Sequence, residues 1–373
     1  MKNNIITLKM KVAIVHYWLV GMRGGEKVLE ALCEIFPNAD IYTHVYDPKA
    51  ISEKLKKHDI QTTFVQKLPF AKKWYSYYLP FMPMALENLD LTQYDLIISS
   101  ESGPAKGIIP SPNATHICYA HSPMRYAWDM FHTYWGDSHW LKRLPISIIM
   151  HYLRIWDSNC ALRTDFFIAN SSFIAQRINK YYRRQAKVIH PPVDIEQFLP
   201  IENPRSDYYL WLGELTKYKR PMDAVQAFND SGKKLIMVGK GELEKILRAK
   251  TNDNISLKSK VCQEELLELF QNCRALIYSG IEDFGIIPVE VMACGRPVIA
   301  YNQGGATDSV LPGITGVLYE QLDSQGLNQG IVEFETIEHK FDPNLIRQHS
   351  EHFSKQRFVR EFEEFLVAID VKS

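Results

Sequence analysis

Short apolar runs alternate with amphipathic stretches along almost the whole chain. Eight runs are apolar at successive positions, which is typical of strands buried on both faces. We therefore predict strands at 11–17, 94–100, 115–120, 165–170, 208–213, 234–239, 274–279 and 297–301. Helical patterns lie between them at 26–36, 171–182, 221–228, 264–272 and 288–293. This repetition of strand and helix predicts parallel sheets built from right-handed β-α-β units.

The strand–helix series starts twice, near Met10 and near Tyr208. The segment between the two series, 190–207, holds four prolines and many polar residues, which is typical of an inter-domain linker. We therefore predict an α/β protein with two doubly wound, Rossmann-like domains. Ligands of such sheets bind beyond the carboxyl ends of the strands, so two facing domains would hold their ligand in the cleft between them.

The expected domain boundaries follow from this division of the chain. An N-terminal Rossmann-like domain is expected at 10–195, and a C-terminal Rossmann-like domain at 206–350. A C-terminal helix at 351–373 is expected to pack back on the N-terminal domain.

Composition excludes several classes of protein. With 46% apolar residues, the 373-residue chain can form two hydrophobic cores, and its 43 basic residues balance 43 acidic ones, so no overall charge directs it to nucleic acid. The six cysteines form no C-x-x-C pair and no zinc-type spacing, which indicates reduced, mostly buried thiols and no metal site. The segment 1–10 is too short and polar for a signal peptide, and no run of ~18 apolar residues occurs. We expect a cytoplasmic protein.

The strongest candidate for a ligand site is the segment EDFGIIPVEVMACGRPVIA at 282–300. Pro288 suits the first turn of a helix, and Gly285 allows the sharp turn before it, so the free N–H groups of that turn favour a phosphate. Glu290 is expected in the same turn and Glu282 in the preceding loop, where carboxylates accept hydrogen bonds from sugar hydroxyls. Alternatively, Glu290 only complements the helix dipole and Glu282 is a solvated charge. The residues alone leave both interpretations open.

A second candidate is the basic loop that follows the predicted strand ending at Gly213. Lys217, Lys219 and Arg220 lie there, just before a predicted helix. Cations at the carboxyl end of a strand can neutralise a diphosphate. An isolated basic loop is more often simply solvated, but the expected place of this one in the cleft favours a ligand.

Weaker signals come from a histidine and from glycine-rich loops. His121 ends the strand at 115–120, where it could bind hydroxyls, relay protons or serve only the structure. The loops at 21–27, 238–243 (with Gly239) and 302–308 could be tight turns or ligand contacts. None completes a dinucleotide fingerprint, and the chain contains no P-loop.

The segment 54–86 combines positive charge with aromatic residues. Six lysines and one acid, Asp59, lie within 54–73, and aromatic residues and methionines follow at 74–86. Such a segment is attracted to an anionic bilayer surface. It could equally be a solvated helix followed by aromatic residues of the core, and the sequence leaves both open.

Together these residues resemble the family-four retaining glycosyltransferases, which have the two-domain GT-B architecture. The resemblance covers nearly the whole chain. It depends on the two glutamates in EDFGIIPVE and on MACGRPVIA, GELTKYKR, HPPVD and RGGEKVLE. The segment at 117–130 is similar to bacterial O-antigen and exopolysaccharide transferases, including GDP-mannose-dependent mannosyltransferases.

The resemblance implies that the domain at 10–195 binds the acceptor and the domain at 206–350 binds the nucleotide sugar. It also implies roles for particular residues. Glu282 would contact the transferred sugar, Lys219 the diphosphate, and His121 would lie near the reacting sugar, which makes these three the expected catalytic residues. Gly24 and Gly25 would form a flexible loop that closes over the site. The full set of implied donor-binding residues is Gly24, Gly25, Gly213, Lys219, Arg220, Gly239, Glu282, Phe284, Gly285, Ile286, Ile287 and Glu290. Such enzymes need no metal or other cofactor.

One position departs from the family pattern. Family members often carry Arg after the glycine of the second-domain loop, where this chain has Glu214. Either Arg220 or Lys217 compensates for the missing cation, or the donor is held differently.

The resemblance therefore implies a peripheral inner-membrane hexosyltransferase for bacterial surface polysaccharide (lipopolysaccharide O-antigen or exopolysaccharide). Mannose from GDP-mannose is the favoured donor and a lipid-linked oligosaccharide the expected acceptor. The alternatives are a UDP-sugar-dependent transferase, a non-hydrolysing sugar-nucleotide epimerase and a non-catalytic transferase-like scaffold. A dinucleotide oxidoreductase fits least well.

Overall fold

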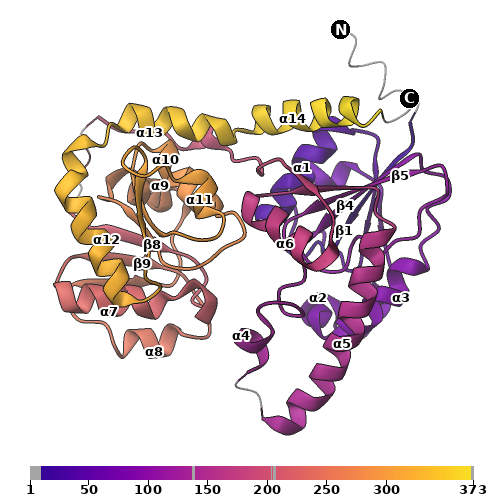
Figure 1. Ribbon diagram of the computed structural model, residues 1–373, viewed down its shortest axis with the longest axis horizontal. Helices are drawn as coiled ribbons and strands as arrows, with labels where there is room; N and C mark the ends of the chain where they lie inside the picture. The colour runs from indigo at the N-terminus through magenta and orange to yellow at the C-terminus, as the bar shows by residue number, and fades with distance from the viewer. Residues whose placement is uncertain (1–9, 137–138, 203, 205–206, 371–373) are drawn as a thin grey trace. The chain divides into compact units, whose positions relative to one another are not determined.

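The computed structural model describes residues 10–136, 139–202, 204 and 207–370 (Figure 1). The chain forms two compact units. Unit 1 comprises residues 1–192 and 358–373, and unit 2 comprises residues 193–357. Residues 1–9, part of the segment judged too short and polar for a signal peptide, lie outside the described residues. Positions 203 and 205–206 of the predicted linker and 371–373 of the predicted C-terminal helix lie outside them as well.

Unit 1 is built on a parallel sheet with the strand order β3-β2-β1-β4-β5-β6-β7. Its strands are β1 (Val12–His16), β2 (Asp40–Thr43), β3 (Ile60–Thr62), β4 (Leu96–Glu101), β5 (Thr115–Ala120), β6 (Phe166–Ala169) and β7 (Ala186–Val188). Its helices are α1 (Gly24–Ile35), α2 (Ala71–Trp74), α3 (Met82–Glu87), α4 (Phe131–Trp135), α5 (Trp140–Leu162), α6 (Ser172–Tyr182) and most of α14 (Lys355–Ala368).

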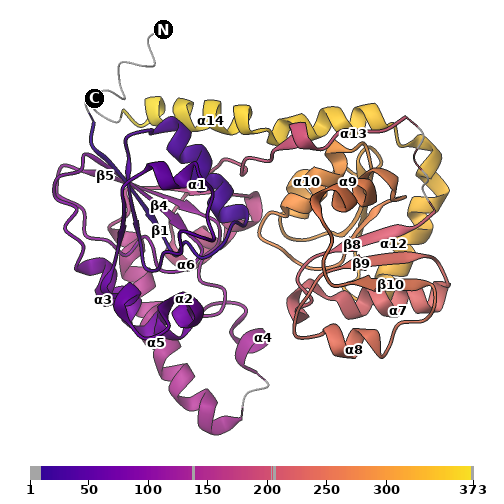
Figure 2. The ribbon, with the colours of Figure 1, turned by 180° about the vertical axis from the view of Figure 1, so that it is seen from behind.

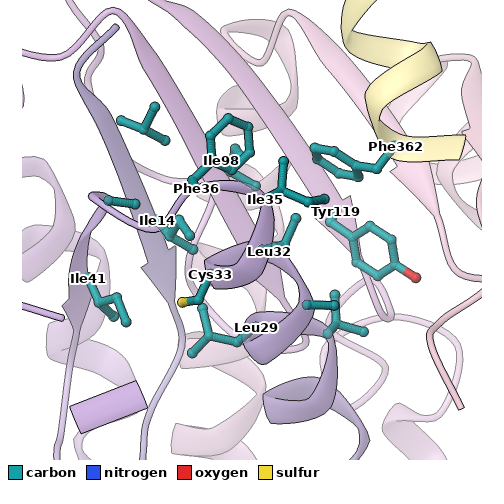
Figure 3. Close-up of a cluster of buried hydrophobic side chains, with 14 of the residues drawn as sticks. Ile14, Leu29, Leu32, Cys33, Ile35, Phe36, Ile41, Ile98, Tyr119 and Phe362 are labelled. Atoms are coloured by element: carbon teal, nitrogen blue, oxygen red, sulfur yellow. The ribbon is translucent and has the colours of Figure 1, made fainter. Parts of the chain in front are cut away.

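Helices cover both faces of this sheet because its strands are apolar on both. On one face, side chains of β1, β4 and β5 pack against α1 and α14, with Tyr119 and Phe362 in the same cluster (Figure 3). On the other face, α3 and α5 pack on β1 and β4, and α6 packs on β5 and β6. The helix α6 begins at a serine cap, since Ser171 Oγ accepts the Ile174 N–H at 3.1 Å.

Unit 2 repeats this design with the strand order β10-β9-β8-β11-β12-β13, again all parallel (Figure 2). Its strands are β8 (Tyr209–Leu212), β9 (Leu235–Val238), β10 (Ile255–Lys258), β11 (Leu276–Tyr278), β12 (Val298–Tyr301) and β13 (Gly316–Tyr319). Its helices are α7 (Pro221–Ser231), α8 (Glu244–Arg248), α9 (Gln263–Asn272), α10 (Ile286–Ala293), α11 (Ala306–Ser309), α12 (Ser324–Ile337) and α13 (Pro343–Ser350). One face packs on α9, α10 and α13, and the other on α7, α8 and α12.

The two doubly wound parallel sheets confirm the predicted fold class, and all eight predicted strands are present. The prediction missed β2, β3, β7, β10 and β13, which lie at or next to sheet edges and have only three or four residues. It also missed α5, because this helix carries apolar residues on its exposed side as well as on its buried side.

The segment predicted as a linker contains the boundary between the units, after residue 192. Directly beyond that boundary, Val193, Ile195 and Phe198 are buried in the core of unit 2. Near the C-terminus, Phe358 and Phe362 belong to the core of unit 1. The residues after the first unit boundary thus belong to the core of unit 2, and those after the second boundary belong to the core of unit 1.

Five of the six cysteines are buried free thiols, and Cys262 is exposed, as expected of mostly buried thiols. Within the described ranges, no helix combines the length and the apolar character that a membrane span needs.

Candidate active site

The two residues with the strongest sequence signals in unit 2 form an ion pair. Lys219 closes the 3-10 turn Lys217–Lys219 after β8, and Glu282 lies in the loop between β11 and α10. Lys219 Nζ lies 2.9 Å from Glu282 Oε1, and the two side chains are 12% and 21% exposed. The structure thus brings together a cation suited to phosphate and a carboxylate suited to sugar hydroxyls at the carboxyl edge of the sheet.

The backbone around Lys219 is fixed by residues that the sequence did not single out. Ser279, at the end of β11, donates from Oγ to the Lys219 carbonyl at 3.0 Å, and it accepts from Trp211 Nε1 at 3.0 Å. A Cβ at Gly280 would lie 2.7 Å from Lys219 Cα, and one at Gly213 would lie 3.1 Å from Lys219 Cδ. Gly280 is therefore required by the close approach of the Lys219 backbone, whereas a side chain at Gly213 would press on the flexible Lys219 side chain. In the sequence, Ser279 and Gly280 at the end of the predicted strand 274–279 could have indicated this close approach to Lys219.

The glycine-rich loop at 302–308 holds the backbone of Glu282. The Gly305 N–H donates to the Glu282 carbonyl at 2.8 Å. A Cβ at Gly304 would lie 2.6 Å from that carbonyl oxygen, and one at Gly305 would lie 2.2 Å from Phe284 Cα. The loop that we ranked as a weak signal thus positions the candidate sugar-binding carboxylate.

Gly285 caps α10 in the left-handed conformation, with φ of 89°. A Cβ there would lie 2.4 Å from Tyr278 Oη, so both conformation and space require glycine. Ile286 and Ile287 open the helix, and Glu290 follows in its second turn. The expectation that Glu290 lies in the first turn is wrong, because the helix starts two residues before Pro288.

Other predicted donor-binding residues of unit 2 have structural contacts. The Arg220 guanidinium pairs with Asp223 and donates from Nη2 to the Leu322 carbonyl at 2.8 Å. Phe284 is buried in the core cluster under α10. A Cβ at Gly239 would lie 1.9 Å from the Gly213 carbonyl oxygen, so this glycine lets the ends of β8 and β9 approach each other.

The position that departs from the family pattern, Glu214, lies on the surface. Its side chain and that of Lys217 are both exposed. With the Arg220 guanidinium held by Asp223, Lys219 is the cation that the structure pairs with Glu282.

In unit 1, His121 follows β5 and belongs to a chain of polar side chains. His121 Nε2 lies 2.9 Å from Ser100 Oγ, and Ser100 Oγ lies 3.0 Å from His16 Nδ1. His16 Nε2 in turn lies 3.7 Å from Glu26 Oε1. These residues come from the carboxyl ends of β5, β4 and β1 and from the first turn of α1. Sequence reasoning identified His121 and missed its three partners.

Burial strongly affects the pKa values of His121 and Glu26. Burial, with a smaller contribution from His16, lowers the pKa of His121 to about 3, so its imidazole is neutral at physiological pH. Burial alone would raise the pKa of Glu26, but the nearby His16 ring and the Arg23 N–H, which donates to the carboxylate, hold it below its ordinary value. Glu26 is therefore an ionised carboxylate inside the unit.

Gly24 and Gly25 are the first two residues of α1. The expectation of a flexible loop at these positions is wrong, because the helix already begins at Gly24. A Cβ at Gly25 would lie 2.4 Å from Tyr17 Oη, so glycine here allows the tyrosine to pack against the helix start.

The structure thus forms two sets of candidate residues, each within one unit. Lys219, Glu282 and the start of α10 form the set of unit 2, and His121 with the start of α1 forms the set of unit 1. Among the residues that the structure describes, no three His, Cys, Asp or Glu side chains gather as a metal site.

Replacing Gly285 with alanine should disrupt this loop, since the new Cβ collides with Tyr278 Oη in a left-handed backbone. We expect a loss of more than about 2 kcal/mol in the free energy of unfolding, together with loss of donor binding. Gly232→Ala is the matched control, because Gly232 has φ of 67° but no atom within 4 Å. It should cost only the backbone strain, about 1 kcal/mol. Urea denaturation of both variants tests this, and equal losses would contradict the steric argument.

Comparison with protein families gives two matches that follow one another along the chain. Residues 22–197 match Glycosyltransferase Family 4, and residues 194–352 match Glycosyl transferases group 1. The second match contains Lys219, Glu282 and α10, and the first contains Glu26, Ser100 and His121.

Individual relatives are more distant. The chain is 29% identical over 177 residues to an uncharacterized glycosyltransferase of Methanocaldococcus jannaschii, covering 46% of this chain and 49% of the relative. It is 27% identical over 228 residues to an alpha-1,3/1,6-mannosyltransferase of Dictyostelium discoideum, covering 48% of this chain and 53% of the relative. The chain thus spans about half the length of these curated relatives.

Among solved structures, Anabaena HepE in complex with UDP has a similar fold. The TM-score is 0.68 at 16% identity, and the match covers 96% of this chain and 100% of HepE. The two family matches together span residues 22–352, and both family descriptions name glycosyltransferases. The chain is therefore similar to glycosyltransferases along almost its whole length, and its fold is similar to that of HepE.

Proposed function

We propose that this protein transfers a hexose from a nucleoside diphosphate sugar to a hydroxyl group, with retention of the anomeric configuration. The observation that carries the proposal is the Lys219–Glu282 pair, with 2.9 Å between Nζ and Oε1, next to the glycine-capped start of α10. A cation, a helix N-terminus and a carboxylate in one loop region suit a diphosphate joined to a sugar. The matches to two glycosyltransferase family models support the same activity.

The proposed chemistry assigns each of these groups one task. As the bond between the sugar C1 and the phosphate oxygen breaks, Lys219 stabilises the negative charge that develops on the diphosphate. The acceptor hydroxyl attacks C1 from the same face, and its proton passes to the departing phosphate oxygen. Glu282 holds hydroxyl groups of the sugar, and the family resemblance implies a further sugar contact by neutral His121. Trapping of a sugar on a protein side chain would contradict this front-face mechanism.

The favoured donor is GDP-mannose and the favoured acceptor is a lipid-linked oligosaccharide of a bacterial surface polysaccharide, such as an O-antigen or exopolysaccharide. The mannosyltransferase among the relatives and the resemblance of 117–130 to mannosyltransferases support mannose. The UDP complex of HepE makes a UDP-sugar the alternative donor. Radiolabelled GDP-mannose, UDP-glucose and UDP-galactose, each offered with membrane lipid extracts, test the choice. Labelled lipid from GDP-mannose alone is the expected result, and no product from any donor would contradict the proposal.

Two alternatives give different results in simple assays. An epimerase would convert the donor in the absence of an acceptor, whereas the proposed enzyme requires one for transfer. A scaffold without activity would not bind donor at all. Isothermal titration with the nucleotide sugar is expected to show a single site, and loss of this heat in Lys219→Ala would link binding to the proposed residues.

We further propose that the protein acts at the cytoplasmic membrane face and contacts the bilayer through residues 54–86. Phe70 and Tyr77 in this segment are 69% and 80% exposed. The positive charge contributes less than its count suggests, since Lys54, Lys56 and Lys72 each pair with an acid. The exposed aromatic side chains are therefore the main argument for membrane contact.

The double variant Phe70→Ser with Tyr77→Ser should bind anionic lipid vesicles at least about tenfold more weakly, because each ring removes apolar area from the contact. Vesicle co-sedimentation at several lipid concentrations measures this. Ile246→Ser with Leu345→Ser is the matched control, since these side chains are 50% and 52% exposed in unit 2. Equal vesicle binding by the double variant and the parent protein would contradict the proposed contact.

A further inference from the structure

The chain of polar side chains behind His121 has no assigned role in the proposed reaction. His16 and Glu26 are 0% and 2% exposed, and Ser100 is fully buried. Burying two imidazole rings, a hydroxyl and a carboxylate in one row is costly unless each group satisfies the next. Hydrogen-bond distances of 2.9 and 3.0 Å join His121, Ser100 and His16. His16 Nε2 makes no hydrogen bond among the described residues, but it lies 3.7 Å from Glu26 Oε1, so its contact with the carboxylate is electrostatic.

The number of protons on Glu26, His16, Ser100 and His121 determines which group donates and which accepts in each of their contacts. At pH 8 a neutral imidazole carries one ring proton. The carboxylate of Glu26 lies 3.7 Å from His16 Nε2, so the proton of His16 belongs on Nε2, and Nδ1 carries a lone pair. Ser100 must then donate its single hydroxyl proton to His16 Nδ1. Its oxygen can only accept from His121 Nε2.

This count leaves the proton of His121 on Nε2 and a lone pair on Nδ1. The backbone holds the residue in place, since the His121 N–H donates to the Glu101 carbonyl at 2.7 Å and the His121 carbonyl accepts from Asn170 Nδ2 at 3.0 Å. Its Nδ1 makes no hydrogen bond to any residue within the described ranges. Nδ1 is therefore a fixed acceptor that remains available to a ligand.

We propose that Glu26, His16 and Ser100 are positioning residues that fix the tautomer of His121, so that its Nδ1 accepts a hydrogen bond from a hydroxyl of the bound sugar. The sugar as ligand rests on the proposed function, whereas the tautomer is a property of the free protein. A ring with the opposite tautomer would present an N–H and would not accept from a hydroxyl.

Nitrogen-15 NMR of the histidine-labelled protein at pH 8 tests the relay without any substrate. The ring shifts of His121 should show one tautomer, with the proton on Nε2. Ser100→Ala and Glu26→Gln should each convert this into a mixture of tautomers. Ser99→Ala is the matched control, because Ser99 is equally buried in the same strand and pairs with His116 Nε2 at 2.9 Å. It should leave the His121 shifts unchanged.

Activity provides a second readout once a donor is known. Ser100→Ala should lower kcat/KM about tenfold, as expected from one lost hydrogen bond, while Ser99→Ala should not. A proton on Nδ1 of His121 in the parent protein, or an unchanged tautomer in both Ser100→Ala and Glu26→Gln, would overturn the proposal. A fixed Nε2–H tautomer in a protein that transfers no sugar would instead contradict only the proposed function.

Discussion

Replacing Glu282 with alanine is expected to abolish sugar transfer and to leave unit 2 folded. The Glu282 side chain is only partly buried, and its backbone contacts to Gly305 and Gly304 do not involve the carboxylate. The variant loses the group that would hold the sugar hydroxyls, and it loses the ion pair with Lys219. We expect a fall in kcat of at least about 10²-fold, the scale of a lost transition-state contact.

Initial rates with the active donor measure the loss of sugar transfer, and a thermal melt measures whether the variant remains folded. Glu265→Ala is the matched control, since Glu265 also pairs with a lysine in unit 2, Lys258 at 2.6 Å, and is partly exposed. It should retain full activity. Parent-like turnover by Glu282→Ala would refute the assigned role.

Replacing Lys106 with methionine is expected to cost unit 1 about 3–5 kcal/mol, the range for removing one partner of a buried ion pair. Lys106 is fully buried, and its Nζ lies 2.7 Å from Glu101 Oε1 and also pairs with Asp157. Asp157 further accepts from Trp128 and Tyr182, each at 2.7 Å. Without the lysine, two carboxylates remain buried with no compensating charge.

The cost should depend on pH. Burial raises the pKa of Glu101, with the charge of Asp157 acting in the same direction and Lys106 opposing it. Removing Lys106 takes away that opposition, so the folded variant takes up protons more readily than the unfolded chain does. Its stability should therefore decrease as the pH rises from about 5 to 8.

Hydrogen exchange of the β4 and β5 amides reports on unit 1 alone and measures both effects. Lys54→Met is the matched control in unit 1, because Lys54 pairs with Glu34 at 3.2 Å and both side chains are exposed, so it should cost less than about 1 kcal/mol. An equally small cost for Lys106→Met would show that the buried pair is not needed.

The central strands could be predicted from the sequence because burial on both faces makes them continuous apolar runs. The edge strand β3 could not, since Ile60–Thr62 is short and half exposed. The residues Lys219 and Glu282 could be predicted because each lies in a local segment with its own signal. Their direct pairing across 63 positions is a product of the order of β8 and β11 in the sheet.

The contacts of His16 and Ser100 behind His121 could not be predicted from the sequence. His16 and Ser100 are 84 positions apart and meet only because β1 and β4 pair with these residues in register. Nothing local to either strand end indicates that contact. A polar residue at the carboxyl end of a buried strand is a usable signal, but its partner depends on strand order and register.

A crystal structure of the protein soaked with its sugar nucleotide tests the central claim most directly. We predict donor density with the diphosphate within hydrogen-bond distance of Lys219 Nζ and near the start of α10, and with the sugar beside the Glu282 carboxylate. Density for the donor at any other place, with the Lys219–Glu282 pair unchanged, would contradict the account.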